Sequence, residues 1–304
     1  MQANLFSPAI ELKEEALKQL SRFELREARE YLAKAKDIDP YLADLELLLS
    51  LCDFAQQAGA HTRMSAAKTE QLWQLAEQKR RAGKIGVAGI KFLREWIARR
   101  QLAGEFTAAG FCSKAAEYLH RGVCHLVLSH WQAAHQDLLN LVTDHQETVL
   151  PLHWAYFADA AHALHRWQEA SLGYALALLA DPHAVDDLTL AQPELHGILQ
   201  RLRFKNDRES LARAWWPFEA WRERVLQIPH GRTFLFSNLQ KQRSLLGSTL
   251  MLEREQRLRQ FCLCLYVDQA NLHDQINFNA REEMQALEPE LFAIYLAEIA
   301  RRQH

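Results

Sequence analysis

Two short stretches decide how this sequence folds: His130-Trp131-Gln132-Ala133-Ala134 and Arg166-Trp167-Gln168-Glu169-Ala170. Their Trp, Gln and second Ala recur at a constant offset of 36 residues. Beyond them Leu138 aligns with Tyr174, and a further helical segment precedes each stretch. A fixed period of this length is typical of stacked helical hairpins. The two stretches therefore predict a helix–turn–helix unit that is used at least twice.

The composition of the 304-residue chain agrees with this prediction. The chain contains only 11 Gly and 8 Pro, and Leu and Ala far outnumber Val, Ile and Thr. β-Sandwiches and barrels need frequent turn residues and β-branched strands, so this composition argues against them. Hydrophobic residues make up 49% of the chain and charged residues 24%, which excludes a disordered or collagen-like chain. We expect a globular protein that is mostly helical.

The clearest unit, residues 151–184, has small residues where two helices would cross and a proline where the unit would end. The residues at these positions and at the neighbouring large positions are Trp154, Phe157, Ala158, Ala170, Tyr174, Ala177 and Pro182. The pattern resembles the tetratricopeptide repeat (TPR), a helical hairpin of about 34 residues. It departs from that family at Ala161, where the family usually has a large aromatic residue.

Three other stretches resemble the repeat less closely. The matching residues are Tyr118, Gly122, Ala134, Leu138 and Leu141 in a unit at 115–146; Leu12, Ala16, Ala28, Leu32, Ala35 and Pro40 in an N-terminal unit; and Leu72, Ala76, Gly83, Ala88 and Phe92 in a degenerate unit at 69–100. We expect Gly83 to form the inter-helix turn of the degenerate unit. The intervals 41–68 and 101–112 interrupt the period, either as inserted helices or as degenerate repeats.

The resemblance implies an all-α fold in which residues 1–184 form a TPR-like helical-hairpin solenoid with irregular insertions. Residues 185–304 are expected to form a helical C-terminal region that caps the exposed end of the stack. The helices expected in that region span 208–227 (interrupted at Pro217), 239–271 and 281–302. The alternative is a set of unrelated antiparallel helix pairs.

By resemblance, a TPR array presents a concave groove, lined by its first helices, that binds peptides or helices of partner proteins. Transferred to this sequence, the groove residues are Trp73, Glu77, Arg80, Leu119, Val123, Leu126, Ala155, Asp159 and His162. The Lys and Asn positions with which some members bind chaperone tails are not reproduced, which argues against that ligand. The resemblance implies a non-enzymatic scaffold or adaptor that binds a partner protein. An assembly chaperone for a secretion or multiprotein machine is a variant of the same function.

Charge suggests a second function. The chain has 36 Lys and Arg against 38 Asp and Glu, so it lacks the basic excess of a dedicated nucleic-acid binder. A local basic cluster, interleaved with Gly83, Gly86 and Gly89, consists of Arg80, Arg81, Lys84 and Lys91. Such a cluster can hold an anion, which would make the chain a phosphate- or nucleotide-dependent regulator. The structural alternative is a pair of solvated helix faces joined by a glycine turn.

Tryptophan is frequent, with eight residues in the chain. Trp131, Trp154 and Trp167 occupy repeat positions and are expected in the core. The segment Trp215-Trp216-Pro217-Phe218-Glu219-Ala220-Trp221 is denser in aromatic residues than one hairpin needs. It either plugs the end of the repeat stack or forms a binding hot spot made of Trp215, Trp216, Phe218 and Trp221.

The sequence contains no convergent catalytic set, and we expect neither an enzyme nor a cofactor. His162 and His165 have the spacing of two metal ligands, but no nearby Cys or carboxylate completes a metal site. Ser65 and Lys68 have an S-x-x-K spacing without the accompanying motifs of acyl-transfer enzymes. The five cysteines do not form a disulfide framework, and the Cys262-Leu263-Cys264 stretch is expected to be buried.

No stretch approaches the roughly 20 apolar residues that cross a bilayer. The longest uncharged run considered, 170–180, is too short, and the acidic N-terminal turns do not resemble a signal peptide. We therefore expect a cytoplasmic protein without membrane insertion. The sequence leaves open the identity of the partner, the pathway and whether the chain associates with itself.

Overall fold

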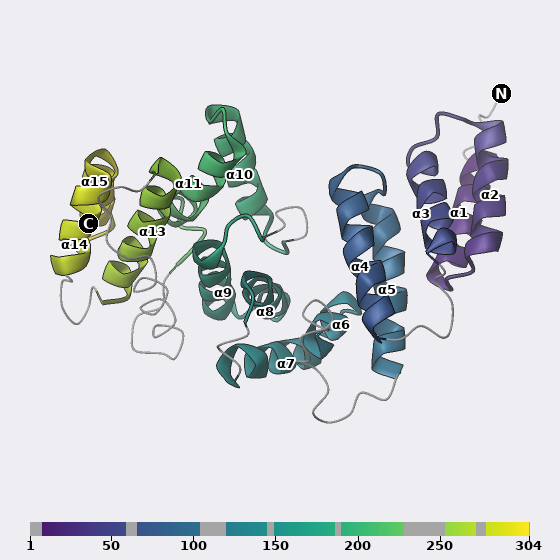
Figure 1. The fold of residues 1–304 in the computed structure, drawn as a ribbon, viewed down its shortest axis with the longest axis horizontal. Coiled ribbons are helices and arrows are strands. Elements are labelled where there is room, and N and C mark those ends of the chain that lie inside the picture. Colours follow the sequence, from purple (N-terminus) through teal and green to yellow (C-terminus); the bar gives the residue numbers. More distant parts are fainter. Residues whose placement is uncertain are drawn as a thin grey trace. The chain divides into compact units, whose positions relative to one another are not determined.

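The computed structural model describes residues 8–58, 66–103, 120–144, 149–185, 190–227, 253–271 and 278–303. Every regular element in these ranges is an α-helix, which confirms the all-α prediction for this part of the chain (Figure 1). The chain divides into two compact units, residues 1–130 and 131–304. The second unit therefore joins residues 151–184, the clearest repeat unit, to the helices expected to cap it.

The first unit contains six described helices, which pack mainly as neighbours in the sequence. They are α1 (Pro8–Ser21), α2 (Leu25–Ile38), α3 (Leu45–Gln57), α4 (Ala66–Arg81), α5 (Val87–Ala103) and α6 (Arg121–Val127). Helix α1 packs along α2, and α4 packs along α5. Two contacts hold α5 against the α1–α2 turn: Phe23 stacks on Trp96 with ring centroids 4.1 Å apart, and the Arg99 guanidinium donates to the Ser21 carbonyl at 3.0 Å.

The second unit contains eight described helices. They are α7 (Trp131–Asp144), α8 (Pro151–Ala163), α9 (Trp167–Ala180), α10 (Pro193–Lys205), α11 (Glu209–Arg222), α13 (Arg254–Asn271), α14 (Phe278–Leu287) and α15 (Pro289–Gln303). Most of them pack on their neighbours in the sequence, and α9 also packs on α11 and α13. Helix α9 thus lies between α8 on one side and the C-terminal helices on the other (Figure 1).

Two of the expected helices in the C-terminal region have different bounds from those predicted. The helix expected at 281–302 is two helices, because Pro289 starts α15 and disfavours the helical conformation at Glu288. The interruption expected at Pro217 is wrong, since α11 continues through it. Trp216 and Phe218, on either side of the proline, are almost completely buried, and this packing offsets the lost backbone hydrogen bond. Of the helix expected at 239–271, residues 239–252 lie outside the described residues.

Helix α9 is buried on all sides after its first turn. Ten consecutive residues, from Ala170 to Leu179, are buried, so the helix has no polar face. At its crossing with α8, a Cβ placed on Gly173 would lie 3.0 Å from the Ala158 Cβ and 3.1 Å from the Trp154 carbonyl oxygen. The two helices therefore approach at backbone distance, which is the close crossing expected from the small residues of the repeat pattern.

Five of the described helices end in the same type of turn. The second residue after the helix adopts the left-handed conformation, with φ between 59° and 68°, and these residues are Phe23, Gly83, Ser129, His165 and Arg224. In each turn the two following main-chain hydrogen bonds of a Schellman motif form, such as Arg166 N–H to the Ala161 carbonyl at 2.9 Å. The expected turn at Gly83 is confirmed. An alanine follows five residues after four of these turn residues, at Ala28, Ala88, Ala134 and Ala170.

We predict that Gly173→Ala destabilises the second unit. The added methyl group would overpack the α8–α9 crossing at a cost of about 1–3 kcal/mol, which exceeds the gain of up to about 1 kcal/mol from helix propensity. Gly197→Ala in α10 is the matched control, because its Cβ would meet only Arg201 Nη1 at 3.7 Å. Urea unfolding followed by circular dichroism should show a lower midpoint for Gly173→Ala and an equal or higher one for Gly197→Ala. A midpoint that rises in both variants would contradict the close crossing.

We also predict opposite effects of exchanging glycine at two of the left-handed turns. A non-glycine residue in this conformation costs about 1–2 kcal/mol, and Ser129→Gly removes this strain. Glycine also increases the entropy of the unfolded chain, which offsets part of the effect. We therefore expect Ser129→Gly to raise stability by about 0.5–1 kcal/mol. Gly83→Ala should lower stability by about 1 kcal/mol, although its Cβ would meet nothing within 4 Å. Thermal unfolding of the two variants measures both effects. Shifts of the same sign would show that backbone strain does not govern these turns.

Candidate functional site

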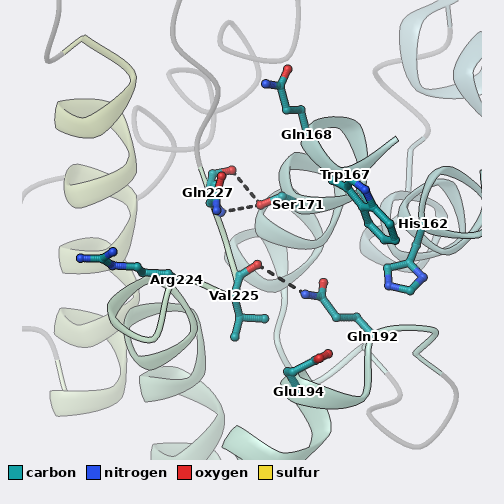
Figure 2. Close-up of a pocket in the computed structure, with 10 residues that line it drawn as sticks. His162, Trp167, Gln168, Ser171, Gln192, Glu194, Arg224, Val225 and Gln227 are labelled. Atoms are coloured by element: carbon teal, nitrogen blue, oxygen red, sulfur yellow. Dashed lines mark hydrogen bonds between the residues drawn. The ribbon is translucent and has the colours of Figure 1, made fainter. Parts of the chain in front are cut away.

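A pocket of about 310 Å3 lies in the second unit (Figure 2). Its lining residues are His162, Trp167, Gln168, Ala170, Ser171, Gln192, Glu194, Arg224, Val225 and Gln227. They come from the end of α8, the first turns of α9, the start of α10 and the segment that follows α11. The pocket therefore forms where two helical hairpins present their turns and ends to each other. We call it the Trp167 pocket.

The back wall of the Trp167 pocket is fixed by hydrogen bonds to α9. The Ser171 hydroxyl donates to the Gln227 carbonyl at 2.8 Å and accepts from the Gln227 N–H. The Gln192 side chain lies over the same segment, with its amide nitrogen 3.5 Å from the Val225 carbonyl oxygen (Figure 2). Because both hydrogen-bonding directions of the Ser171 hydroxyl are used, this group holds the wall in place.

Trp167 forms an aromatic surface at the pocket. It is the first residue of α9, and 55% of it is exposed. The His162 ring meets it edge-on, with centroids 5.0 Å apart, and the His165 ring lies at 5.2 Å. Partial burial lowers the pKa of His162, against the opposing effect of Glu194, and this favours the neutral form of the imidazole. The indole is thus held between two rings and still presents a large accessible area.

Two exposed charges complete the pocket. Neither Glu194 nor Arg224 forms an ion pair with any residue in the described ranges. Glu194 lies in the first turn of α10, where the helix dipole favours a carboxylate. Figure 2 shows Glu194 on the side of the pocket near His162, whereas the Arg224 guanidinium extends to the opposite side. The pocket therefore has an acidic aromatic end and a separate basic end.

A buried carboxyl group lies behind this site. Asp159 in α8 is 8% exposed, and its Oδ1 accepts from the Tyr174 hydroxyl at 2.6 Å and from the Ala191 N–H at 2.8 Å. Ala191 directly precedes the pocket residue Gln192. Burial raises the pKa of Asp159 to about 7, although both hydrogen bonds act in the opposite direction. Asp159 thus ties the segment before α10 to the α8–α9 core.

We predict that Asp159 makes stability fall as pH rises from about 4 to about 7. In this range the unfolded carboxyl group, with a pKa near 4, has lost its proton while the folded one still holds it. The contribution is at most about 1.4 kcal/mol per pH unit, and it levels off above pH 7. Asp159→Asn keeps an acceptor oxygen and removes the titration. The free energies of unfolding of the unchanged protein and of Asp159→Asn, measured by urea unfolding across pH 4–8, should therefore differ by an amount that changes with pH. A constant difference across this range would contradict the prediction.

The groove residues transferred from the TPR resemblance are mostly buried. In the first unit Trp73, Arg80 and Val123 are at most 6% exposed, and Leu126 is half-buried. Glu77 lies between two guanidinium groups, Arg80 at 3.0 Å and Arg94. In the second unit Ala155 and Asp159 are buried and His162 lines the Trp167 pocket. Leu119 lies outside the described residues.

The basic cluster is largely paired within its own helices. Arg80 is buried against Glu77, and the Lys91 ammonium lies 4.0 Å from the Glu95 carboxylate. Lys84 is exposed beside the Gly83 turn, and the Arg81 side chain lies outside the described residues. The cluster therefore offers an anion less charge than the sequence suggests.

The tryptophan-rich segment forms the core that joins α11 to its neighbours. Trp216, Phe218 and Trp221 are at most 1% exposed, and Trp215 is half-buried. The Trp216 indole donates to the Leu195 carbonyl at 2.9 Å, and Trp221 packs on Tyr295 with centroids 5.2 Å apart. This burial fits the alternative in which the segment plugs the end of the helix stack.

The remaining sequence candidates have structural surroundings. No group of three or more His, Cys, Asp or Glu in the described ranges has the arrangement of a metal site, and His162 and His165 flank Trp167. Cys262 and Cys264 are buried as expected; Cys112, Ser65 and the side chain of Lys68 lie outside the described residues. No described helix is long and apolar enough to cross a bilayer.

Sequence reasoning missed most of the pocket. Trp167 was expected in the core, and this is wrong: α9 begins at this residue, so its side chain lies at the rim. The pairing of Trp131 with Trp167 at turn positions was the available signal, because both follow a left-handed residue by two positions. Comparison of the chain with family models, with curated proteins and with solved structures found no match. The assignment of function therefore depends on the geometry of this site.

Proposed function

We propose that this chain is a non-enzymatic interaction module of TPR-like helical hairpins, and that the Trp167 pocket binds a peptide segment of a partner protein. The observation that carries the proposal is the 55% exposure of Trp167 beside a pocket whose opposite wall is fixed. Tryptophan is strongly enriched among the residues that dominate protein–protein binding energy. A rigid indole also loses little conformational entropy when a partner covers it.

The repeated turn supports the TPR-like part of the proposal. Four left-handed turn residues precede an alanine by five positions, and Ala28, Ala134 and Ala170 are at most 2% exposed. The same backbone geometry therefore recurs with the same small residue, which an unrelated set of helix pairs would not require. This turn geometry also positions the helix ends that carry His162, Trp167 and Arg224.

The groups in the pocket suit binding better than acid–base or nucleophilic chemistry. The Ser171 hydroxyl is engaged by the Gln227 backbone in both directions, and the His162 ring packs against Trp167. A serine nucleophile needs a base within hydrogen-bonding reach. The Ser171 hydroxyl and the His162 imidazole contact other groups and not each other, so they do not form such a pair. Amide side chains from Gln168, Gln192 and Gln227 instead line the pocket, and amides can pair with a peptide backbone.

We predict that a random peptide display library, selected on the purified protein, yields peptides that bind at Trp167. Trp167→Ala should weaken their binding at least about tenfold, because loss of an aromatic anchor costs 2 kcal/mol or more at such sites. Trp131→Ala is the matched control, since Trp131 occupies the equivalent repeat position outside the pocket. Fluorescence anisotropy of the labelled peptides measures the affinities.

Thermal unfolding of both variants establishes that they fold. The proposal fails if no peptide is enriched, or if the enriched peptides bind Trp167→Ala as tightly as the unchanged protein.

A further inference from the structure

The Trp167 pocket contains both an exposed tryptophan and a carboxylate that forms no ion pair with any residue the structure describes. Trp167 and Glu194 both line the pocket. His162 contacts the indole and also interacts electrostatically with the Glu194 carboxylate. Partial burial lowers the pKa of His162 and so favours the neutral imidazole, which carries no charge to compensate that of Glu194. The nearby Arg166 pairs with Glu169 at 3.6 Å, and Arg224 points to the opposite end of the pocket (Figure 2).

Three sets of residues in the described ranges show a tryptophan, a glutamate and an arginine together. Each time a guanidinium group lies over a buried tryptophan ring and pairs with a glutamate. The three sets are Trp73, Arg94 and Glu77; Trp216, Arg213 and Glu209; and Trp221, Arg302 and Glu298. The guanidinium carbon lies 5.4, 6.0 and 4.2 Å from the respective ring centroid. These distances are within the range of cation–π attraction.

The pocket contains a tryptophan and a glutamate, Trp167 and Glu194, but no guanidinium group of the described residues lies over this indole. The three internal tryptophans are at most 3% exposed, whereas Trp167 is 55% exposed. A guanidinium group suits the space over the Trp167 indole better than an ammonium group, because it stacks on an indole and still offers donors to a carboxylate. The amide oxygens of Gln168 and Gln192 provide further acceptors around the same space.

We infer that the Trp167 pocket takes an arginine side chain of the partner segment, which stacks on Trp167 and pairs with Glu194. This inference rests on the proposed function and specifies the chemistry of its ligand. The partner's arginine would complete the set that the chain forms internally with Arg94, Arg213 and Arg302. The Glu194 carboxylate selects a positively charged side chain, and the Trp167 indole selects a planar cation over a tetrahedral one.

The test uses three blocked pentapeptides, Ac-Gly-Gly-X-Gly-Gly-NH2, in which X is arginine, lysine or citrulline. Citrulline has the shape of arginine without its charge. The indole N–H signal of Trp167 in a nitrogen-15 NMR spectrum, assigned with Trp167→Phe, reports on binding. The arginine peptide should shift this signal in a saturable way, and the citrulline peptide should bind at least about tenfold more weakly, a difference of 1.4 kcal/mol. The lysine peptide should lie between them.

Two variants that each remove one exposed carboxylate identify the group that selects the cation. Glu194→Gln should reduce the affinity for the arginine peptide to that of the citrulline peptide. Glu290→Gln is the matched control, because Glu290 also follows the first proline of its helix, α15, and lies outside the pocket; it should not weaken binding. Both side chains are exposed and unpaired in the described ranges, so neither change should affect folding. The interaction should also weaken as salt is raised from 50 to 500 mM.

The outcome separates this inference from the proposed function. Selected peptides that depend on Trp167 but show no enrichment of arginine, and that bind Glu194→Gln unchanged, would overturn the inference and leave the function intact. Equal binding of the citrulline and arginine peptides, or of the lysine and arginine peptides, would also overturn it. Failure to select any peptide that depends on Trp167 would remove both.

Discussion

The burial of α9 on all sides between Ala170 and Leu179 is the constraint on which the second unit depends. A helix without a polar face is stable in water only when neighbours cover it on every side, and α8, α11 and α13 do so. The last carbonyl groups of a helix have no donor within it. Arg259 from α13 donates to the Ala180 carbonyl, the last one of α9, at 2.7 Å. Arg213 from α11 donates to two carbonyls of the segment that follows α9, those of Pro182 and Val185. The C-terminal helices therefore complete α9 in both packing and hydrogen bonding.

The same helix positions the binding site. Its first turns carry Trp167 and Ser171, and the hydroxyl of Ser171 fixes the segment that forms the opposite wall. Behind it, Asp159 and Tyr174 hold Ala191 and hence the start of α10. The pocket thus lies on a rigid base, because the groups that hold its walls are themselves part of the core. A site supported in this way keeps its shape while it is empty, which reduces the entropy lost on binding.

The hairpins could be predicted from the sequence, and most of the site could not. The recurrence of Trp, Gln and Ala located α9 and its turn, and the uncharged run after Ala170 matches a helix that is buried all round. The pocket joins residues near 167, 192 and 225, and no spacing rule relates segments so far apart in the chain. Asp159 has the periodicity of a groove residue, but its burial depends on Tyr174 and the Ala191 N–H, which only the tertiary structure brings to it.

The left-handed turns have a consequence for how such a protein can diversify. The residues His165 and Arg224 occupy two of these turns, where main-chain hydrogen bonds set the direction of the chain and the side chain is exposed. His165 packs on Trp167, and Arg224 lines the other end of the pocket. In these two residues the main-chain atoms form the turn of the hairpin, whereas the side-chain atoms face the pocket and its indole. Mutation at these two positions can alter what is recognised without altering the scaffold, so selectivity and stability can evolve separately.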